Sequence, residues 1–206
     1  MDEETAKIQK RYNRIAKFYD IFELFGEKVW FYKWRKKFIS PLKGKILEIG
    51  IGTGKNIDFY NREAIVTGID FSKDMLNKAQ EKLEKAQKKN ITLKQMDVEN
   101  LEFTDNSFDY VVTSFVFCSV PKPIKGLKEI KRVLKPTGKL IMIEHILSKN
   151  TILAFIENTL NLLVKYIMGV NINRDTKQNI IDVGFIIVED KNLALVDIFR
   201  LFRAKK

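Results

Sequence analysis

The segment KILEIGIGTG, residues 45–54, decides the fold of this chain. It begins as an apolar run typical of a buried strand and ends in three glycines at alternate positions, Gly50, Gly52 and Gly54. Residues 55–60 then have the pattern of a helix start. Because glycine lacks a Cβ, a ligand can approach such a turn closely, so we expect a binding loop between a strand and a helix.

Two kinds of ligand fit a loop of this sort. A loop that cradles a pyrophosphate has the pattern G-x-G-x-x-G, and this sequence has Lys55 where that pattern places its last glycine. The alternative is a related turn that holds a nucleoside carrying an amino acid. The spacing therefore disfavours a nicotinamide or flavin enzyme and favours the second ligand.

The rest of the chain predicts an α/β fold, because short β-branched runs alternate with helical segments. Strands are expected at 45–50, 65–70, 91–96, 108–114, 139–145, 185–190 and 194–200. Helices are expected at 73–89, after Ser72, and at 123–134, before the turn at Pro136, Thr137 and Gly138. Crossovers of this length join parallel strands, so we expect a doubly wound, Rossmann-like sheet.

Two carboxylates follow the next two strands of the predicted sheet. Asp70 ends the second strand, where a carboxylate can accept hydrogen bonds from both hydroxyls of a ribose. Asp97 follows the third strand, where it could accept from the amino group of an adenine. The ends of three successive strands are therefore expected to face one nucleoside.

These residues resemble the class I S-adenosylmethionine-dependent methyltransferases, with ILEIGIGTG, VTGIDFS and QMDVENLEF as the matching motifs, over about residues 44–145. The resemblance implies a seven-stranded sheet of order 3-2-1-4-5-7-6 with the last strand antiparallel, an N-terminal helical lid, and S-adenosylmethionine as cofactor. Carried over by motif position, the implied cofactor-binding residues are Glu48, Gly50, Gly52, Gly54, Asp70, Phe71, Asp97, Val98 and Ser114.

Length and composition predict a single domain over residues 1–206. The resemblance implies its division into a helical lid or interface segment at 1–43, a cofactor-binding core at 44–145, and substrate-side helices with the last two strands at 146–206. One His and one Cys cannot form a zinc cage, so no metal is expected. The first residues lack the apolar run of a secretory signal, so we expect a cytoplasmic protein.

The candidates for catalysis are few. His145, the single histidine, follows the fifth strand at the rim of the sheet, where it could act as a general base or be an ordinary hydrogen-bonded strand-end residue. Tyr12 and Tyr19 could close over the cofactor as part of the lid, or pack within an amphipathic helix. For Cys118 we favour a packing role, because methyl transfer requires no covalent intermediate with the enzyme.

The N-terminal segment 5–39 predicts two amphipathic helices around Gly26, the second rich in aromatic and basic residues. Trp30 and Trp34 could lie at a membrane interface while the basic side chains meet anionic lipid. Their spacing also suits a stripe that packs onto the sheet. Of the two, we favour contact with an anionic membrane, as a peripheral protein on its inner face.

The N-terminal segment also resembles phosphatidylethanolamine N-methyltransferases and quinone-ring C-methyltransferases, and other pieces resemble lipophilic thiol methyltransferases. The resemblance implies a lipid or other hydrophobic acceptor, first a phosphatidylethanolamine-type amine and then a quinone ring or thiol. A non-catalytic nucleoside-binding regulator is a further alternative, while nucleic acid is disfavoured because no RNA-binding module is present.

The helix at 151–168 is expected to be buried on more than one side, and Arg174 could contact a phosphate or Asp175. Oligomeric state stays open.

Overall fold

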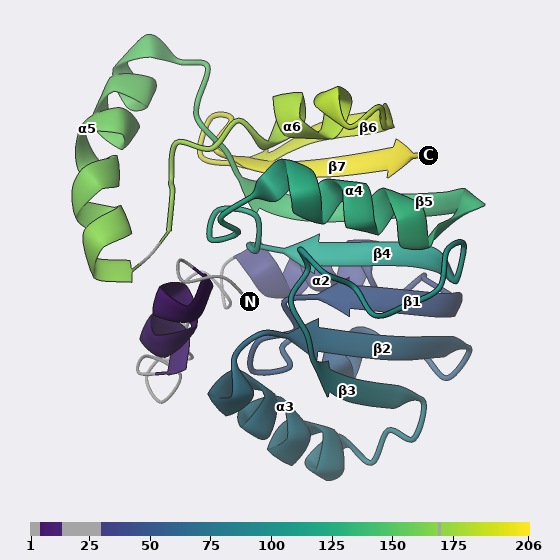
Figure 1. The fold of residues 1–206 in the computed structure, drawn as a ribbon. Coiled ribbons are helices and arrows are strands. Elements are labelled where there is room, and N and C mark those ends of the chain that lie inside the picture. The colour runs from purple at the N-terminus through teal and green to yellow at the C-terminus, as the bar shows by residue number, and fades with distance from the viewer. Residues whose placement is uncertain (1–4, 14–29, 169) are drawn as a thin grey trace.

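A computed structural model describes residues 5–13, 30–168 and 170–206. They form one seven-stranded sheet of order β3-β2-β1-β4-β5-β7-β6 (Figure 1). The strands are β1 Gly44–Ile49, β2 Ala64–Asp70, β3 Ile91–Gln95, β4 Phe108–Ser114, β5 Leu134–His145, β6 Ile186–Ala194 and β7 Phe199–Lys205. Strands β1 to β5 pair in parallel, and β7 runs antiparallel between β5 and β6. The predicted fold class is confirmed.

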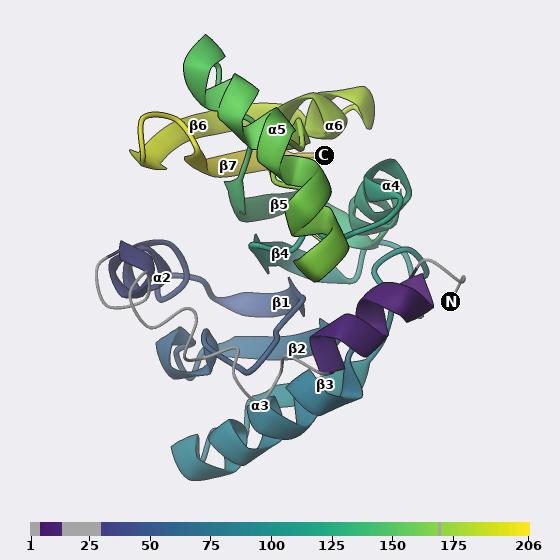
Figure 2. The ribbon, with the colours of Figure 1, turned by 90° about the vertical axis from the view of Figure 1, so that its left-hand side faces the viewer.

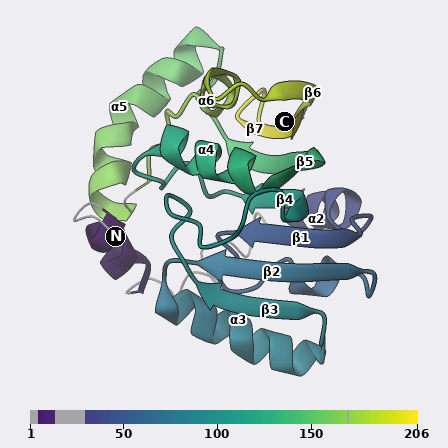
Figure 3. The same cartoon turned by 45° about the vertical axis from the view of Figure 1, so that its right-hand side comes forward.

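Helices cover both faces of the sheet. They are α2 Tyr32–Phe38, α3 Lys73–Ala86, α4 Pro123–Val133, α5 Thr151–Met168 and α6 Thr176–Asp182, with a short 3-10 turn, η2, at Ile57–Phe59. Residues 5–13 are also helical. Helix α4 lies in front of the sheet and α2 behind it (Figures 1 and 3).

The core is divided into two layers by the alternation of side chains along the strands. On β5, Leu140 and Met142 pack in the cluster that contains residues of α4, whereas Ile141 and Ile143 pack in the cluster that contains residues of α2 and α3. All four side chains are buried. The sheet is therefore apolar on both faces, as expected for a doubly wound fold.

Several predicted boundaries differ from the structure; for example, β6 extends to Ala194 and α3 ends at Ala86. The helix expected at 55–60 is reduced to η2. Strand β5 begins at Leu134, because the predicted turn at 136–138 becomes an irregularity in its pairing with β4. The last strand was predicted at 194–200 from its apolar run. Leu195 and Val196 instead lie in the turn between β6 and β7 with positive φ angles, so β7 begins only at Phe199.

The aromatic stripe near the N-terminus packs onto the sheet. Trp34 and Phe38 are buried, and Trp34 lies 5.7 Å, between ring centroids, from Phe199 of β7. Trp30 stacks on Trp34 at 6.5 Å. The expectation that Trp34 faces a membrane is therefore wrong, because its ring is part of the core, while Gly26 lies outside the described residues.

Helix α5 forms where it was expected, but not in the expected environment. It stands away from the sheet, and many of its apolar side chains are exposed rather than buried on several sides (Figure 1). Residues 5–13 lie beside it, across the carboxyl ends of the strands (Figure 2). Within the described residues, none of the helices has the length and hydropathy needed to cross a membrane.

Candidate functional site

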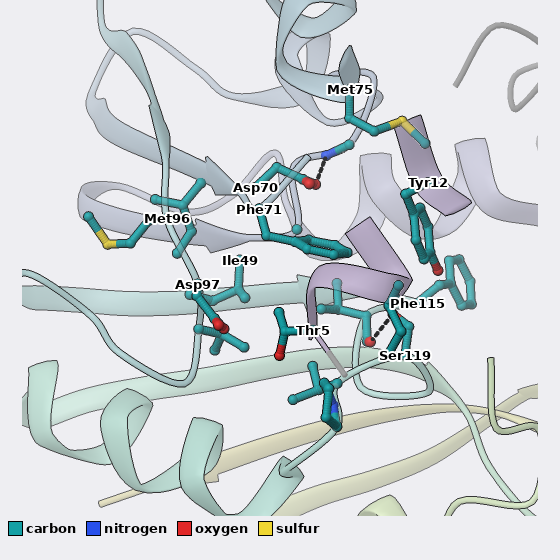
Figure 4. Close-up of a pocket in the computed structure, with 18 of the residues that line it drawn as sticks. Thr5, Tyr12, Ile49, Asp70, Phe71, Met75, Met96, Asp97, Phe115 and Ser119 are labelled. Carbon is teal, nitrogen blue, oxygen red and sulfur yellow. Dashed lines mark hydrogen bonds between the residues drawn. The ribbon is translucent and has the colours of Figure 1, made fainter. Parts of the chain in front are cut away.

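A cavity opens at the carboxyl ends of β1, β2 and β4, where the order of the strands reverses (Figure 4). Its walls come from the glycine loop after β1, the ends of β2 and β4, and the segment after β3. The helix at 5–13 closes it from the outside with Thr5, Ile8 and Tyr12. Ligands of open α/β sheets bind at this position, so the topology alone marks the cavity as the candidate site.

The glycine loop forms the first wall. Gly50 and Gly52 line the cavity, and both have positive φ angles, 65° and 56°, which favour glycine. A Cβ built on Gly52 would have no neighbour nearer than the carbonyl oxygen of Gly50 at 4.0 Å. The backbone at Gly52 therefore borders open space in which a ligand can approach it closely.

Asp70 forms the second wall at the end of β2. Its Oδ2 accepts the backbone N–H of Gly52 at 3.0 Å, and its Oδ1 accepts the N–H of Ser72 at 2.8 Å. A carboxylate oxygen has a second lone pair, so each can still accept a hydroxyl from a ligand. Burial raises the pKa of Asp70 to about 6, and the two backbone donors oppose that shift. Asp70 is therefore a fixed hydrogen-bond acceptor, ionised at neutral pH.

The third wall follows β3. Asp97 and Val98 line the cavity beside Met96, and Asp97 Oδ1 accepts the backbone N–H of Glu99 at 2.9 Å. Val98 is buried and supplies an apolar surface suited to a flat ring. Ser114, at the end of β4, completes this set opposite the glycine loop.

The predicted lid is present in part. Tyr12 packs edge-to-face on Phe71, 5.6 Å between ring centroids, and both rings line the cavity. Gln9 donates to the carbonyl of Phe71, and Ser72 Oγ donates to Asn13 Oδ1, so the helix is held to the end of β2 by polar contacts. Tyr19 lies outside the described residues.

Two residues assigned to cofactor binding lie behind the loop and are not among the described residues that line the cavity. A Cβ on Gly54 would come within 2.6 Å of Ile57 Cδ1 and 3.2 Å of Ala79 Cα, so this glycine allows α3 to pack against the loop. Glu48 is buried beneath the loop. For Glu48 and Gly54, cofactor binding stays a prediction.

Glu48 is part of a buried polar chain. Its Oε2 accepts the hydroxyl of Tyr60 at 2.8 Å, and its Oε1 accepts Asn56 Nδ2 at 2.7 Å. Asn56 Oδ1 in turn accepts Arg35 from α2 at 2.7 Å. Burial raises the pKa of Glu48 to about 7, against these hydrogen bonds. These buried hydrogen bonds fix the end of β1, from which the glycine loop begins.

Glu144 is a supporting residue that the sequence analysis missed. It is buried on β5 and accepts the Thr113 hydroxyl at 2.7 Å and the backbone N–H groups of Val116 and Phe117 at 3.1 and 3.3 Å. Val116 lies against Gly50, where a Cβ would meet it at 2.5 Å. Burial raises the pKa of Glu144 to about 7. An acidic residue within the apolar run LIMIEH was the available signal.

His145 and Cys118 lie apart from the described cavity wall. His145 Nε2 is 3.4 Å from Glu157 Oε1 on α5, and burial lowers the pKa of His145 to about 4. The imidazole is therefore neutral at pH 7, so this contact is not an ion pair. Burial raises the pKa of the Cys118 thiol to about 12, which fits the predicted packing role.

Arg174 lies in a second hollow, between α5 and the helix at 5–13. Its Nη2 donates to the carbonyl oxygen of Val120 at 2.9 Å. Lys7, Arg11 and Lys165 line the same hollow. This hollow shares Ile8 and Pro121 with the first cavity, so the two adjoin, but Arg174 is not among the described residues that line the first cavity.

Comparisons with known proteins agree with this geometry. Residues 47–142 match a family model described as a methyltransferase domain. The chain is 38% identical over 123 residues to a phosphatidylethanolamine N-methyltransferase of Cereibacter sphaeroides, covering 59% of this chain and 61% of the relative. It is 32% identical over 151 residues to a demethylmenaquinone methyltransferase of Desulfitobacterium hafniense, covering 69% and 60%. The chain thus spans about 60% of the length of these curated relatives.

The fold is also that of a solved structure. An S-adenosylmethionine-dependent methyltransferase of Thermotoga maritima superposes with a TM-score of 0.72 at 20% identity, covering 96% of this chain and 99% of that one. At this identity the match shows a shared fold and does not by itself indicate a shared acceptor.

Proposed function

We propose that this chain is an S-adenosylmethionine-dependent methyltransferase of class I and that it transfers a methyl group to a hydrophobic, membrane-held acceptor. The proposal is supported by the match of residues 47–142 to a methyltransferase-domain model and by the methyltransferase relatives. The observation that carries the proposal is the joint position of Gly52 and Asp70. The backbone of one and the carboxylate of the other border the same cavity and are joined by a hydrogen bond of 3.0 Å. This is a site for the ribose of a nucleoside next to a loop that admits close approach.

The residues present fit S-adenosylmethionine. Asp70 would hold the ribose, Asp97 and Val98 the adenine, and Gly50, Gly52 and Ser114 the methionine end. The described lining contains two carboxylates and no basic side chain, which suits a ligand with a cationic sulfonium. When bound, this cofactor supplies an activated methyl group that needs no covalent help from the protein.

The protein's own contribution is alignment and exclusion of water. Tyr12 and Phe71 close the outer side of the cavity, and Phe115 and Val116 present an apolar wall at the end of β4. The position of Phe115 is fixed by its ring contact with Phe31, 4.7 Å between centroids. An acceptor that reaches this wall meets the methyl donor in a site from which bulk water is largely displaced.

We leave His145 out of the proposed proton transfers. It is neutral at pH 7, is a weak base because its pKa is lowered to about 4, and belongs to the contact with Glu157 beneath α5. An amine acceptor would therefore have to lose its proton to a group other than His145. The role of Tyr19 as part of a lid stays a prediction.

The first choice of acceptor is the amine of a phosphatidylethanolamine-type phospholipid. The relative from C. sphaeroides supports it, and so does the apolar character of the cavity wall at Phe115 and Val116. The relative from D. hafniense favours a second candidate, C-methylation of a quinone ring. Both acceptors are held in membranes, so we place the proposed reaction at the inner face of the membrane.

The test is methyl transfer from labelled S-adenosylmethionine into total lipid extract presented as vesicles, with separation of the products. Label in phospholipid headgroups supports the amine, and label in quinone supports the ring. Label in a lipophilic thiol would select that alternative. Cofactor binding with no labelled product in any of these classes would contradict the proposal and favour a nucleoside-binding regulator. The Asp70→Asn variant, which we expect to lose both binding and transfer, controls for contaminating activity.

A further inference from the structure

Helix α5 has its polarity reversed for a helix on the surface of a protein in water. Its buried side carries Glu157 and Asn161, one turn apart. Glu157 accepts the backbone N–H of Ser148 at 2.8 Å, and Asn161 accepts the N–H of Ile172 at 2.9 Å. These two buried polar side chains thus accept hydrogen bonds from the protein backbone.

The opposite side of α5 is apolar and exposed. Its exposed side chains are Ile152, Phe155, Ile156, Leu160, Leu162, Leu163 and Tyr166. Phe155 is 72% exposed and Leu162 is 77% exposed. A surface helix normally turns such a stripe toward the core, and a contiguous exposed patch of this kind marks an interaction surface.

The charges next to this stripe identify the partner. Arg11 donates to the carbonyl oxygen of Lys165 at 3.0 Å, which joins the helix at 5–13 to the last turn of α5. Arg11 and Lys165 line the second hollow together with Lys7 and Arg174, and its described lining contains no acidic side chain. An apolar stripe bordered by basic residues matches the boundary between acyl chains and anionic headgroups.

A second copy of the chain fits this surface less well. Symmetric pairing through α5 would bring the two basic borders together, and each chain has a net charge of +11. An anionic bilayer has the opposite charge and accepts the apolar stripe without such repulsion.

We propose that the apolar face of α5 docks on an anionic lipid bilayer, with Arg11 and Lys165 meeting headgroup phosphates. The inference rests on the proposed function only for the nature of the acceptor. It adds a consequence for access: the hollow beside α5 shares Ile8 and Pro121 with the first cavity, so docking through α5 would bring that side of the site near the lipid. The proposal thus places the membrane contact on α5 and not on α2, which contains Trp34.

The test is co-sedimentation with vesicles of phosphatidylcholine alone and of phosphatidylcholine with phosphatidylglycerol, without methyl donor. We expect binding to the anionic vesicles and at least a tenfold loss of affinity in the double variant Phe155→Gln/Leu163→Gln. The matched control is Ile65→Gln/Val196→Gln, which removes two exposed apolar side chains outside α5 and should bind like the wild type.

A charge pair of variants tests the basic border. Arg11→Gln/Lys165→Gln should weaken binding to anionic vesicles several-fold and reduce its dependence on salt. Lys85→Gln/Lys89→Gln, which removes the same charge from the exposed end of α3 and the turn after it, should not. Circular dichroism and cofactor binding of each variant show that the fold is intact.

Three results would overturn the proposal: absence of wild-type binding to anionic vesicles, equal binding of the α5 variant, or a dimer in solution that this variant converts to monomer. Because the assay contains no methyl donor, a failure here is separate from a failure of methyl transfer. Retained transfer to a detergent-dispersed lipid in a protein that ignores vesicles would refute docking and leave the proposed chemistry standing.

Discussion

The backbone N–H of Gly52 donates to Oδ2 of Asp70 across 3.0 Å, and this bond ties the glycine loop after β1 to the end of β2. An Asp70→Asn variant keeps the shape of the side chain but turns an amide N–H₂ toward one of two backbone donors. We expect a loss of roughly 1–3 kcal/mol in the free energy of unfolding and about tenfold or more in affinity for S-adenosylmethionine. Calorimetry measures both, with Asp74→Asn, an exposed neighbour, as control. Equal affinity in the Asp70 variant would contradict the ribose assignment.

The pH dependence of cofactor binding follows from the same carboxylate. Burial raises the pKa of Asp70 to about 6, so the free protein has largely protonated Asp70 below that pH. Hydrogen bonds from ribose hydroxyls favour the ionised form, so binding should release protons near pH 6, and affinity should rise from pH 5 to 7. Titration calorimetry in two buffers of different ionisation enthalpy measures the released protons. An affinity that is constant over this range would refute the prediction.

The two glycines at 52 and 54 should respond differently to alanine. In Gly54→Ala the new Cβ meets Ile57 and Ala79, and we expect a destabilisation of roughly 2–4 kcal/mol with moderate loss of cofactor affinity. In Gly52→Ala the Cβ meets open space, so the cost in stability is only about 1 kcal/mol from the positive φ, while affinity falls strongly. Denaturation curves paired with binding data separate the two roles. The opposite ranking would show that Gly52 packs and Gly54 binds.

Glu144 supports the loop after β4, and its removal should affect the site from outside. A Gln at 144 cannot accept from the Thr113 hydroxyl and both backbone donors at once, so we expect a loss of about 1–3 kcal/mol in stability and a several-fold loss of cofactor affinity. The exposed Glu102→Gln change serves as the comparison. If both variants behave like the wild type, Glu144 does not position this loop.

The Tyr60 hydroxyl should stabilise the protein more at high pH than at low pH. Its hydrogen bond favours the ionised form of Glu48, whose pKa is raised by burial to about 7. Below that pH the Glu48 carboxyl group is mostly neutral, so removal of the Tyr60 hydroxyl costs less free energy of unfolding. Tyr60→Phe should therefore cost about 1–2 kcal/mol at pH 8 and clearly less at pH 5.5. Urea denaturation at both pH values measures the difference. A larger loss of stability at pH 5.5 would contradict the view that the Tyr60 hydroxyl stabilises the ionised form of Glu48.

The sequence predicted the sheet because β1 to β5 contain short runs rich in apolar and β-branched residues, and because β1 is followed by Gly50 and β2 ends at Asp70. It also predicted that Gly50, Asp70 and Asp97 lie together at one cavity, since each ends or follows a strand and parallel strands place such residues at one edge of the sheet. The local sequence pattern was sufficient to place a residue in the fold where that residue directly follows a strand.

What the sequence did not predict depended on contacts between distant segments. Gly54 and Glu48 belong to the same loop motif as Gly50, but the motif does not show that Gly54 packs against α3 or that Glu48 accepts a hydrogen bond from Tyr60. The apolar composition of 151–168 predicted burial, because periodicity does not show which side of a helix meets the protein. The spacing of Trp34 was compatible with a place in the core and with a membrane contact. Its packing against Phe199 of β7, which is distant in the sequence, places it in the core.

The position of β7 has a consequence for the synthesis of this protein. Strand β7 fills the gap between β5 and β6, yet its residues 199–205 leave the ribosome after those of both neighbours. Until then, the nascent sheet presents β5 with an unpaired edge rich in apolar residues, which is a template for wrong strand pairing. A chain that stalls before residue 199 is therefore a natural client for chaperones, and removal of these few residues should harm folding far more than their number suggests.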